Sequence, residues 1–575
     1  MSGRGRANEN MDGNRMGHKL DSATSGWLDD KSASTSGDDV FSLASKTLEQ
    51  MLTDLAEPLP GQRAIEQQSS IVRGITRFMS GQTQIRPEAG DRRFSDPQWT
   101  DNPFYNAYMQ CYLAWAKGMN DMAGFIGLDD VSVKRARYFI NNLTDALSPT
   151  NTMVGNPGAM RRFVETGGKS ALDGLKNFLT DLTENRGMPS QVDKSKYKVG
   201  GNLAITPGIV VSRTDVIEVI QYKPRTPEVY AIPVLIASSM INKFYALDLA
   251  PGRSFVEYAL DHGMQVFIIS WRNPTAAHKD WSFDTYVDAI LQACGVVREI
   301  CGVDQLHLLA VCVGGLLTSA LLGYLAAKDN RQIRSSTIFV TSLDNAVEDT
   351  KLSIFATEET VRMAKQATHV QGVLAGDDLA NIFAWMRPND LVWSYWINNY
   401  LMGNPPPAFD ILYWNNDSTR LPAVLHGEML DQGLNNAFAH PSAVKVFGVP
   451  IDLSKTTCDI YVLAGATDHI CPWKNVYAGA HLFGGQVKFI LVGSGHVQSF
   501  INPPGNPKAK FFVNSRLPTS PDEWLETAEQ RRGSAWGDWI DWVQARSGKL
   551  KSADPVGSER HPPLCDAPGL YVFEP

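Results

Sequence analysis

A strand that turns tightly into a helix, at residues 304–327 (DQLHLLAVCVGGLLTSALLGYLAA), constrains the fold of this chain more than any other stretch. Residues 305–311 are short and apolar, which predicts a buried strand, and residues 316–327 predict a buried helix. Cys312 lies at the corner between them, with small residues two positions away on either side. Such a corner strains its middle residue and exposes that side chain at the carboxyl edge of the sheet. The pattern A-x-C-x-G is a variant of the G-x-S-x-G nucleophile elbow.

Two other interpretations of this stretch stay open from the residues alone. A buried cysteine beside a pair of glycines is usually only a small apolar residue in a core. Residues 305–327 also contain no Asp, Glu, Lys or Arg, which is a property of helices that span membranes. The adjacent glycines after a β-type run argue against a spanning helix, as does the alternation of strands and helices around it.

The bulk properties narrow the class of protein. A length of 575 residues predicts two or more domains, and the net charge of −8 argues against non-specific binding of nucleic acid. The seven cysteines are scattered, odd in number and without a C-x-x-C pair. This predicts neither a disulfide framework nor a zinc site, and it suits a reducing cytosol. Residues 1–14 show no apolar segment of a secretory signal.

The composition changes along the chain and predicts three regions. Residues 1–40, rich in Gly, Ser, Asn and Asp, are expected to be a disordered tail. Residues 41–199 are predicted to form a helical N-terminal domain. Residues 200–575 open with a hairpin and continue as alternating strands and helices, which predicts a mostly parallel sheet with helices on both faces, the α/β-hydrolase fold. The alternation stops over residues 345–445, which are expected to form a lid or a well-packed subdomain.

The sheet region is expected to hold a set of short β-rich strands, at residues 208–212, 216–222, 229–237, 264–271, 305–311, 336–342, 459–464 and 487–492. Between them, helices are expected at residues 255–262, 284–301, 316–327 and 474–483. Tryptophans of the insertion are predicted to lie mostly in its core, with a few lining an acyl channel: Trp385, Trp393, Trp396 and Trp414. Trp536, Trp539 and Trp542 share one helical stripe, which predicts a packed core or an interface.

Three residues with the chemistry of a catalytic triad each follow a predicted strand. Cys312, Asp468 and His496 occur in the order nucleophile, acid, histidine that α/β-hydrolases use. His496 comes after the strand expected to be the final one, in a loop rich in glycine. His469 competes for the role of base, but it lies beside the acid, where this topology needs none.

The roles of the three residues follow from their chemistry. A free thiol has a pKa of about 8.5, so Cys312 is expected to be mostly neutral at pH 7 until His496 accepts its proton as a general base. Asp468 would orient the imidazole and stabilise its charged form. The oxyanion formed on attack is expected to accept hydrogen bonds from the backbone N–H of Val313 and of a residue in the loop 240–242, Ile241. Because a cysteine acyl-enzyme is itself a thioester, the choice of cysteine points to acyl transfer rather than hydrolysis.

Several long motifs make the chain similar to a known family. Over roughly residues 90–575 it resembles the polyhydroxyalkanoate synthases, through DRRFSDPQW, INKFYALDL, ISWRNP, AVCVGG, TDHICPW and SGHVQSFINPP. The segments FAWMRPNDL, FDILYWNNDSTRLP and HLFGGQV resemble the class II branch, the single-subunit synthases of medium-chain polyesters. Ala310 departs from the glycine usual at the start of the family box, and Val313 is a class I feature.

The resemblance implies an activity, a substrate and partners. The substrate would be an (R)-3-hydroxyacyl-CoA, and CoA would be the leaving group, with no metal and no other cofactor. Cys312 would carry the acyl group or the growing polyester, and the 3-hydroxyl of the next unit would attack, activated by His496 or Asp468. Members of the family act as cytoplasmic homodimers on the surface of the polyester granules that they build.

Two rival functions and four questions stay open. A Cys-dependent α/β-hydrolase, such as an esterase, a thioesterase or a polyester depolymerase, would use the same triad. A granule-coat protein without catalytic activity would not need it. The sequence leaves undecided the length of the acyl side chain, the state of the lid, monomer against dimer, and which of His496 and Asp468 activates the hydroxyl.

Overall fold

A computed structural model of the chain describes residues 85–88, 91–123 and 129–575, all of which belong to one compact unit that spans 54–575. The tail predicted at residues 1–40 and the first part of the helical region lie outside the described residues. The boundary expected at residue 199 stays a prediction.

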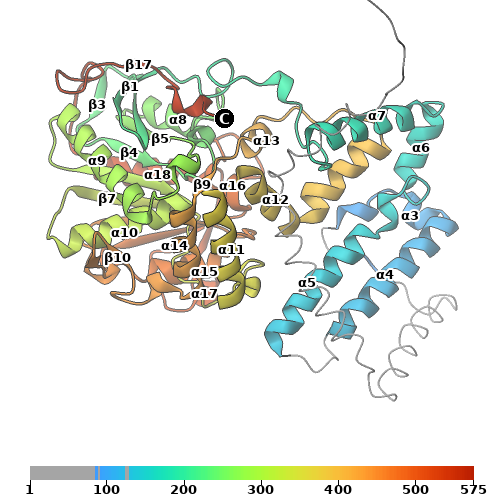
Figure 1. Cartoon of the computed structure of the whole chain (residues 1–575). Helices are drawn as coiled ribbons and strands as arrows, with labels where there is room; N and C mark the ends of the chain where they lie inside the picture. Colours follow the sequence, from blue (N-terminus) through green and yellow to red (C-terminus); the bar gives the residue numbers. More distant parts are fainter. Residues whose placement is uncertain (1–84, 89–90, 124–128) are drawn as a thin grey trace, which may run out of the picture. The chain divides into compact units, whose positions relative to one another are not determined.

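A sheet of eleven strands forms the centre of the region after residue 207, counted over the described residues (Figure 1). The strands are β1 (Gly208–Arg213), β2 (Ile217–Tyr222), β4 (Val234–Ala237), β5 (Val266–Trp271), β6 (Leu306–Val311), β7 (Ile333–Phe339), β12 (Asp459–Gly465), β13 (Val487–Val492), β14 (Lys510–Val513), β15 (Glu529–Arg532) and β17 (Cys565–Asp566). They lie in the order β15-β14-β13-β12-β7-β6-β4-β5-β2-β1-β17. Neighbours from β13 to β5 run parallel, and β1 and β2 form the predicted antiparallel hairpin.

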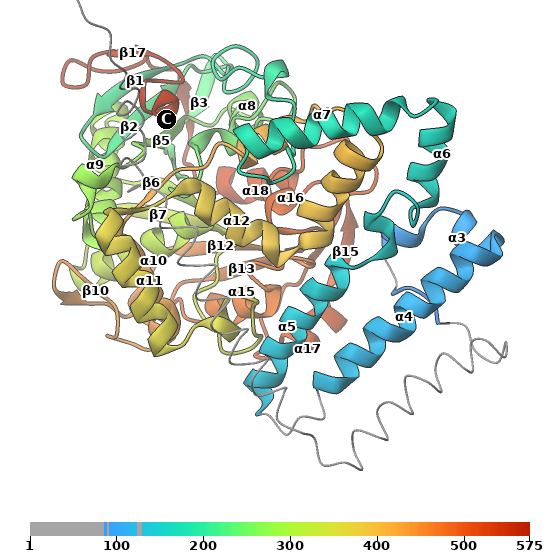
Figure 2. The same cartoon turned by 45° about the vertical axis from the view of Figure 1, so that its right-hand side comes forward.

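Helices cover both faces of the sheet because successive side chains of each buried strand point to opposite sides (Figure 2). On one side Leu308 of β6 packs in a core with α9 (Phe283–Cys301), α10 (Val313–Ala327) and α15 (Trp473–Ala480). On the other side Leu309 packs in a core with α8 (Phe255–Asp261), α16 (His496–Phe500) and α18 (Ala535–Gln544). The predicted α/β-hydrolase arrangement is thereby confirmed.

Two expectations about the strands were wrong. The single strand expected at residues 229–237 is two strands, β3 (Glu228–Tyr230) and β4, and β3 pairs instead with β16 (Leu550–Ser552) in a separate sheet. Pro233 lies at the break, and proline has no N–H to donate to a ladder. In addition, β13 is the last parallel strand but not the final one, because β14 and β15 extend the sheet antiparallel beyond it.

The helical region before the sheet and the insertion within it are also present. The first contains α3 (Gln98–Asp101), α4 (Pro103–Ala123), α5 (Asp130–Ala146), α6 (Pro157–Glu165) and α7 (Lys169–Glu184). The insertion contains α11 (Glu358–Gln371), α12 (Gly376–Met386), the π-helices η7 (Asn389–Trp393) and η8 (Trp396–Leu401), α13 (Asp410–Asn415) and α14 (Ala423–Leu434). Buried contacts join the two: the hydroxyl of Tyr400 donates to Asp181 at 2.7 Å, and Asn177 donates to the carbonyl of Asn399 at 2.9 Å.

The tryptophan stripe near residue 540 belongs to the core. Trp536, Trp539 and Trp542 on α18 are all buried, and the indole N–H of Trp539 donates to the hydroxyl of Thr337 on β7 at 3.0 Å. The packed-core interpretation is therefore confirmed. Among the described helices, none combines the length and the apolar character needed to cross a bilayer.

Candidate active site

The elbow between β6 and α10 holds Cys312 in a strained backbone conformation. Its φ is 53° and its ψ is −124°, a region that residues with a Cβ rarely adopt. The turn is possible because glycines follow it. A Cβ on Gly314 would lie 2.9 Å from the carbonyl oxygen of Ser238, and one on Gly315 would lie 2.8 Å from the Cβ of Thr341. The elbow is therefore packed directly against the loop that follows β4.

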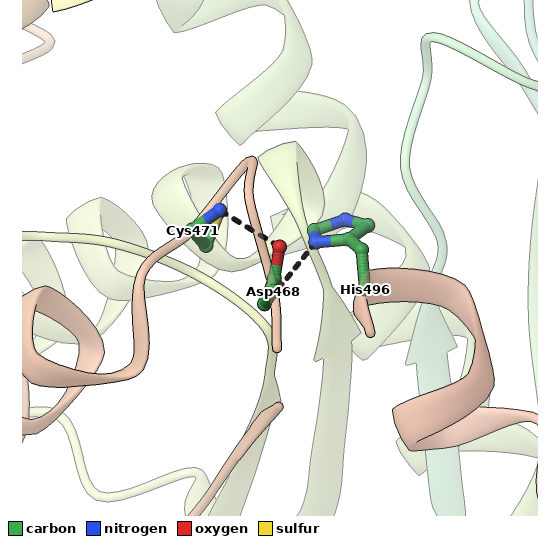
Figure 3. Close-up of side chains that lie close together, drawn as sticks. All are labelled: Asp468, Cys471 and His496. Atoms are coloured by element: carbon green, nitrogen blue, oxygen red, sulfur yellow. Dashed lines mark hydrogen bonds and ion pairs between the residues drawn. The ribbon is translucent and has the colours of Figure 1, made fainter. Parts of the chain in front are cut away.

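His496 and Asp468 meet at the carboxyl ends of β13 and β12 (Figure 3). The Nδ1 of His496 lies 2.7 Å from Oδ2 of Asp468, and both side chains are buried. The other carboxylate oxygen of Asp468 accepts from the backbone N–H groups of Ile470 at 2.9 Å and Cys471 at 3.0 Å. These bonds fix the carboxylate, so its Oδ2 can hold the imidazole in one orientation and one tautomer.

The charge state of His496 depends on its two neighbours. Burial alone would lower the pKa of His496, but Cys312 and Asp468 outweigh it and hold that pKa well above its usual value. Both neighbours favour the imidazolium because each carries negative charge when ionised. Cys312 and His496 line one cavity, and Asp468 is hydrogen-bonded to His496, so the structure brings the three predicted residues to one place.

A cavity of about 500 Å³ opens above these residues. Its walls include Cys312 and His496 from the sheet edge, Ile241 and Asn242 from the loop after β4, and Trp414 from the insertion. Of the four insertion tryptophans singled out in the sequence, Trp414 alone lines this cavity, and its indole N–H donates to the carbonyl of Lys243 at 2.8 Å. His469 lines it as well, and burial lowers the pKa of His469 to about 4, so its imidazole is neutral at pH 7.

The two backbone groups expected to bind an oxyanion belong to Val313, the residue after Cys312, and to Ile241, which lines the same cavity as Cys312. Val313 follows Cys312 at the first turn of α10, and its N–H finds no hydrogen-bond acceptor among the described residues. The N–H of Ile241 makes only a long bond of 3.4 Å to the hydroxyl of Ser239. Both N–H groups can therefore donate a hydrogen bond to a bound oxyanion. Their role in binding an oxyanion stays a prediction.

A second thiol at the site was missed in the sequence. Cys471 is buried, and its sulfur, a ring nitrogen of His496 and an oxygen of Asp468 all lie within 4.8 Å of one another (Figure 3). Burial raises the pKa of Cys471 to about 11, so it stays a neutral thiol at pH 7. Its position three residues after Asp468 in TDHICPW was the available signal, since an aspartate commonly accepts from the N–H groups that follow it.

The same three side chains are the group of described residues that could together hold a metal ion. Both oxygens of Asp468 already accept hydrogen bonds, one from His496 and two from the backbone. A metal would have to replace the bond that orients the imidazole, so the arrangement fits a histidine–carboxylate pair better than a metal centre. The expectation of no metal and no other cofactor stays a prediction.

The strand order and the site together define a class of protein. The order β1-β2-β5-β4-β6-β7-β12-β13, with a nucleophile elbow after β6, is that of an α/β-hydrolase. In agreement with this, the family described as alpha/beta hydrolase fold matches residues 246–503.

Comparison with known proteins identifies the family within this class. The family described as Poly-beta-hydroxybutyrate polymerase (PhaC) N-terminus matches residues 90–259. The chain is 46% identical over 501 residues to poly(3-hydroxyalkanoate) polymerase 1 of Ectopseudomonas oleovorans, covering 87% of this chain and 89% of that one. It is 47% identical, with the same coverage, to polymerase 2 of that organism. It is 38% identical to a polymerase subunit of Cupriavidus necator, covering 86% of this chain and 84% of that one. The chain therefore belongs to the poly(3-hydroxyalkanoate) polymerase family and is an enzyme of the acyltransferase class.

Proposed function

We propose that this chain polymerises (R)-3-hydroxyacyl-CoA into polyhydroxyalkanoate and releases CoA, through a thioester on Cys312. The observation that carries the proposal is the strained cysteine at the elbow, which lines one cavity together with His496 in a chain 46% identical to a polymerase of this kind. The identity supports the substrate class, and the geometry supports the covalent step.

In the first half-reaction the Cys312 sulfur attacks the thioester carbonyl of the substrate. The raised pKa of His496 favours the state in which the proton already sits on the imidazole, with Asp468 beside it. The new carbon–sulfur bond forms as the bond to CoA breaks, and the proton of His496 passes to the sulfur of CoA. The backbone N–H groups of Val313 and Ile241 stabilise the oxyanion in between.

In the second half-reaction a 3-hydroxyl attacks the thioester on Cys312. His496, now neutral, accepts the proton of that hydroxyl, and the Cys312 sulfur leaves. One ester bond forms for each thioester bond broken, so the chain grows without another source of energy. We assign the proton transfer to His496 rather than to Asp468 because both oxygens of Asp468 are already occupied.

The experiment uses the purified chain and an (R)-3-hydroxyacyl-CoA, and it follows CoA release with a thiol reagent alongside polymer formation. We expect CoA and polymer to appear together, and Cys312→Ala to abolish both. Free hydroxy acid without polymer would establish the rival, a Cys-dependent hydrolase. Full function in Cys312→Ala would establish the other rival, a granule-coat protein.

We also propose that the enzyme works as a cytoplasmic homodimer on the surface of its polyester granules. Helix α7 supports the surface contact, since four of its leucines are about half exposed or more: Leu172, Leu175, Leu179 and Leu182. Light scattering of the purified chain tests the dimer, and the monomer composition of the polymer made from mixed substrates determines the chain-length preference.

A further inference from the structure

We infer that Thr341 and Thr419 are positioning residues that aim the two oxyanion donors, which deepens the function proposed above and rests on it. The hydroxyl of each threonine donates a hydrogen bond to the carbonyl oxygen of one peptide group, which lies far away in the sequence. The N–H on the other side of that peptide is one of the two donors.

In a trans peptide the C=O and the N–H point in opposite directions within one plane. A group that fixes the direction of the carbonyl of residue i therefore fixes the direction of the N–H of residue i+1. The donor at Val313 is controlled by the carbonyl of Cys312, and the donor at Ile241 by the carbonyl of Met240.

Thr341 controls the first of these peptides. Its buried hydroxyl lies 2.8 Å from the carbonyl oxygen of Cys312, and it shares its proton with the carbonyl of Phe339 at 3.0 Å. The N–H of Gly315 donates to the same Cys312 oxygen at 2.8 Å. With its carbonyl held from that side, the peptide turns the N–H of Val313 the other way. Gly315 also makes room for Thr341, since a Cβ there would overlap it.

Thr419, at the end of the insertion, controls the second peptide. Its hydroxyl donates to the carbonyl oxygen of Met240, and its backbone N–H donates to the carbonyl of Ile241 at 3.3 Å. Because Thr419 binds the Met240 carbonyl, the N–H of Ile241 faces away from Thr419. Thr419 is almost fully buried, whereas Ile241 lines the cavity that Cys312 also lines.

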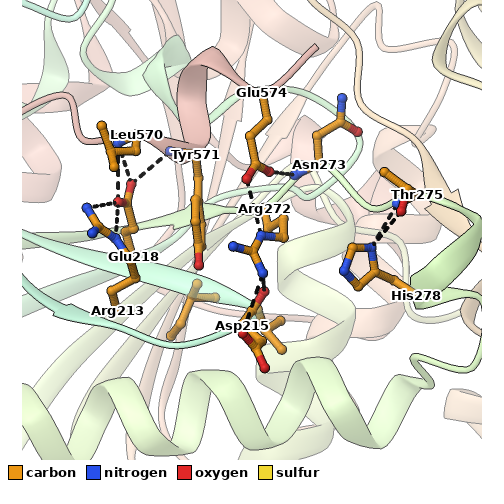
Figure 4. Close-up of polar contacts among 12 residues, drawn as sticks. Arg213, Asp215, Glu218, Arg272, Asn273, Thr275, His278, Leu570, Tyr571 and Glu574 are labelled. Carbon is orange, nitrogen blue, oxygen red and sulfur yellow. Dashed lines mark hydrogen bonds and ion pairs between the residues drawn. The ribbon is translucent and has the colours of Figure 1, made fainter. Parts of the chain in front are cut away.

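Residues 570–575 form a strap, in which Glu574 contacts Arg272 and Asn273 (Figure 4), and this strap holds the residue after Thr419. Arg420, the residue after Thr419, donates to the carbonyl oxygen of Pro575 at 2.6 Å and of Pro274 at 2.7 Å. The strap is held by Glu574, whose carboxylate accepts from the side chain of Arg272 and from the backbone N–H of Asn273, both at 3.2 Å. The bonds of Arg420 therefore fix the backbone next to Thr419, whose hydroxyl binds the loop after β4.

The test compares Thr419→Val, which removes the hydroxyl and keeps the shape, with Thr419→Ser, which keeps the hydroxyl. Loss of one oxyanion donor lowers kcat by about 10²–10³-fold in other enzymes, so a misdirected donor should lower kcat by on the order of 10- to 100-fold. We expect that loss in Thr419→Val, with KM changed by less than about threefold, and recovery to within about threefold of wild type in Thr419→Ser. Thr341→Val and Thr341→Ser should behave in the same way.

A second readout separates positioning from general damage to the site. Alkylation of Cys312 by iodoacetamide forms no oxyanion, so Thr419→Val should be alkylated at the wild-type rate although it is acylated slowly. The matched control is Thr144→Val in α5, which also removes a buried hydroxyl bound to a backbone carbonyl, that of Asn141 at 3.0 Å. It should keep the wild-type kcat.

Three results would overturn the inference. These are a wild-type kcat in both valine variants, an equal loss in the serine variants, and a fall in alkylation that matches the fall in acylation. If Thr419→Val does not fold, Thr341→Val decides the same question through the other donor. Failure of the proposed function is a separate result, because it would appear as turnover that survives Cys312→Ala.

Discussion

At Cys312, the backbone conformation and the chemistry of the side chain depend on the same contacts. The positive φ of Cys312 is a strained backbone conformation, and two hydrogen bonds maintain it. The N–H of Cys312 donates to the carbonyl of Phe339 at 2.9 Å, and the carbonyl of Cys312 accepts from the hydroxyl of Thr341. In that conformation Cys312 lines the same cavity as His496. Cys312 therefore owes its position to the carbonyl of Phe339 at the end of β7 and to the hydroxyl of Thr341 just after that strand.

The first prediction concerns the base. His496→Gln should lower turnover by at least about 10²-fold, the usual size of general base catalysis, because glutamine cannot take up a proton. Thermal unfolding and circular dichroism should show an intact fold, since glutamine can still donate to Asp468. The measurement is CoA release under saturating substrate.

Two further histidines serve as comparisons for that variant. His369→Gln, on an exposed position of α11, should turn over at the wild-type rate. His469→Gln changes a residue of the cavity wall and should lose less activity than His496→Gln. Near-wild-type turnover in His496→Gln, or a larger loss in His469→Gln, would refute the assignment of the base.

Among the elements, α7 shows how tightly the helical region packs against the insertion. A Cβ on Gly174 of α7 would lie 2.7 Å from the carbonyl carbon of Tyr400 in η8. Glycine is therefore required at this position for a close approach of two backbones, although glycine weakens a helix in general.

The second prediction uses this contact. Gly174→Ala should lower the free energy of unfolding by about 1–3 kcal/mol, the usual cost of overpacking, because the methyl group forces α7 away from Tyr400. The matched control is Gly295→Ala in α9, where a Cβ would meet no atom within 4 Å. That variant should gain up to about 1 kcal/mol from helix propensity. Urea unfolding of both variants is the measurement, and equal stabilisation of the two would contradict the packing described.

The elements also show which parts of the fold the sequence could predict. Long apolar strands such as β6 and β12, and helices such as α9, were predicted to within about three residues, because burial and periodicity are local properties. The short strands β14 to β17 were missed. They are two to four residues long, and β15 and β16 are mostly exposed, so few buried residues mark them in the sequence. Pro233 is the local signal for the break between β3 and β4, because proline cannot donate to a strand ladder.

In the candidate site, too, some residues could be predicted from the sequence and others could not. Chain order and loop position predicted Cys312 and His496, which line one cavity, and Asp468, which is hydrogen-bonded to His496. Thr341 and Thr419 could not be predicted, because each acts through a carbonyl 29 or 179 residues away in the sequence. A local sequence pattern cannot indicate a contact between residues so far apart in the chain.

For the molecule as a whole, His307 on β6 links the centre of the sheet to the end of α18. Its ring nitrogens lie 2.7 Å from the hydroxyl of Ser335 and 3.0 Å from that of Ser547, and the side chain is buried. Burial, aided by the charges of Arg334 and Arg546, lowers the pKa of His307 to about 3. The imidazole is therefore neutral in the folded protein at any pH above about 3.

The third prediction is the pH dependence that this pKa causes. Above pH 6.5 the imidazole is neutral in both states and contributes no pH dependence. Between pH 6.5 and 3 the unfolded chain binds a proton that the folded chain does not, so the free energy of unfolding falls as the pH falls. The loss attributable to His307 should reach roughly 2–3 kcal/mol at pH 4.5.

The measurement compares urea unfolding of wild type and His307→Asn between pH 7 and 4.5. The variant should be less stable at pH 7, where it loses hydrogen bonds, but its stability should fall less steeply with acid. An identical slope in the two proteins would show that His307 is not responsible.

The bonds around residues 414–420 have a consequence for the motion of the insertion. Trp414 is bound to Lys243, and Asp417 accepts from the hydroxyl of Tyr245 at 2.7 Å. Thr419 hydrogen-bonds to Met240, so this short segment is anchored to the residues that follow β4, and Ser418 and Thr419 also pack against Gly376 at the start of α12. If a lengthening polyester displaces the insertion, we expect the hinges to lie outside residues 414–420. Deuterium uptake by the backbone amides should then stay slow at residues 414–420 throughout turnover while it rises in α11 and α12, and uniform uptake across the insertion would contradict this expectation.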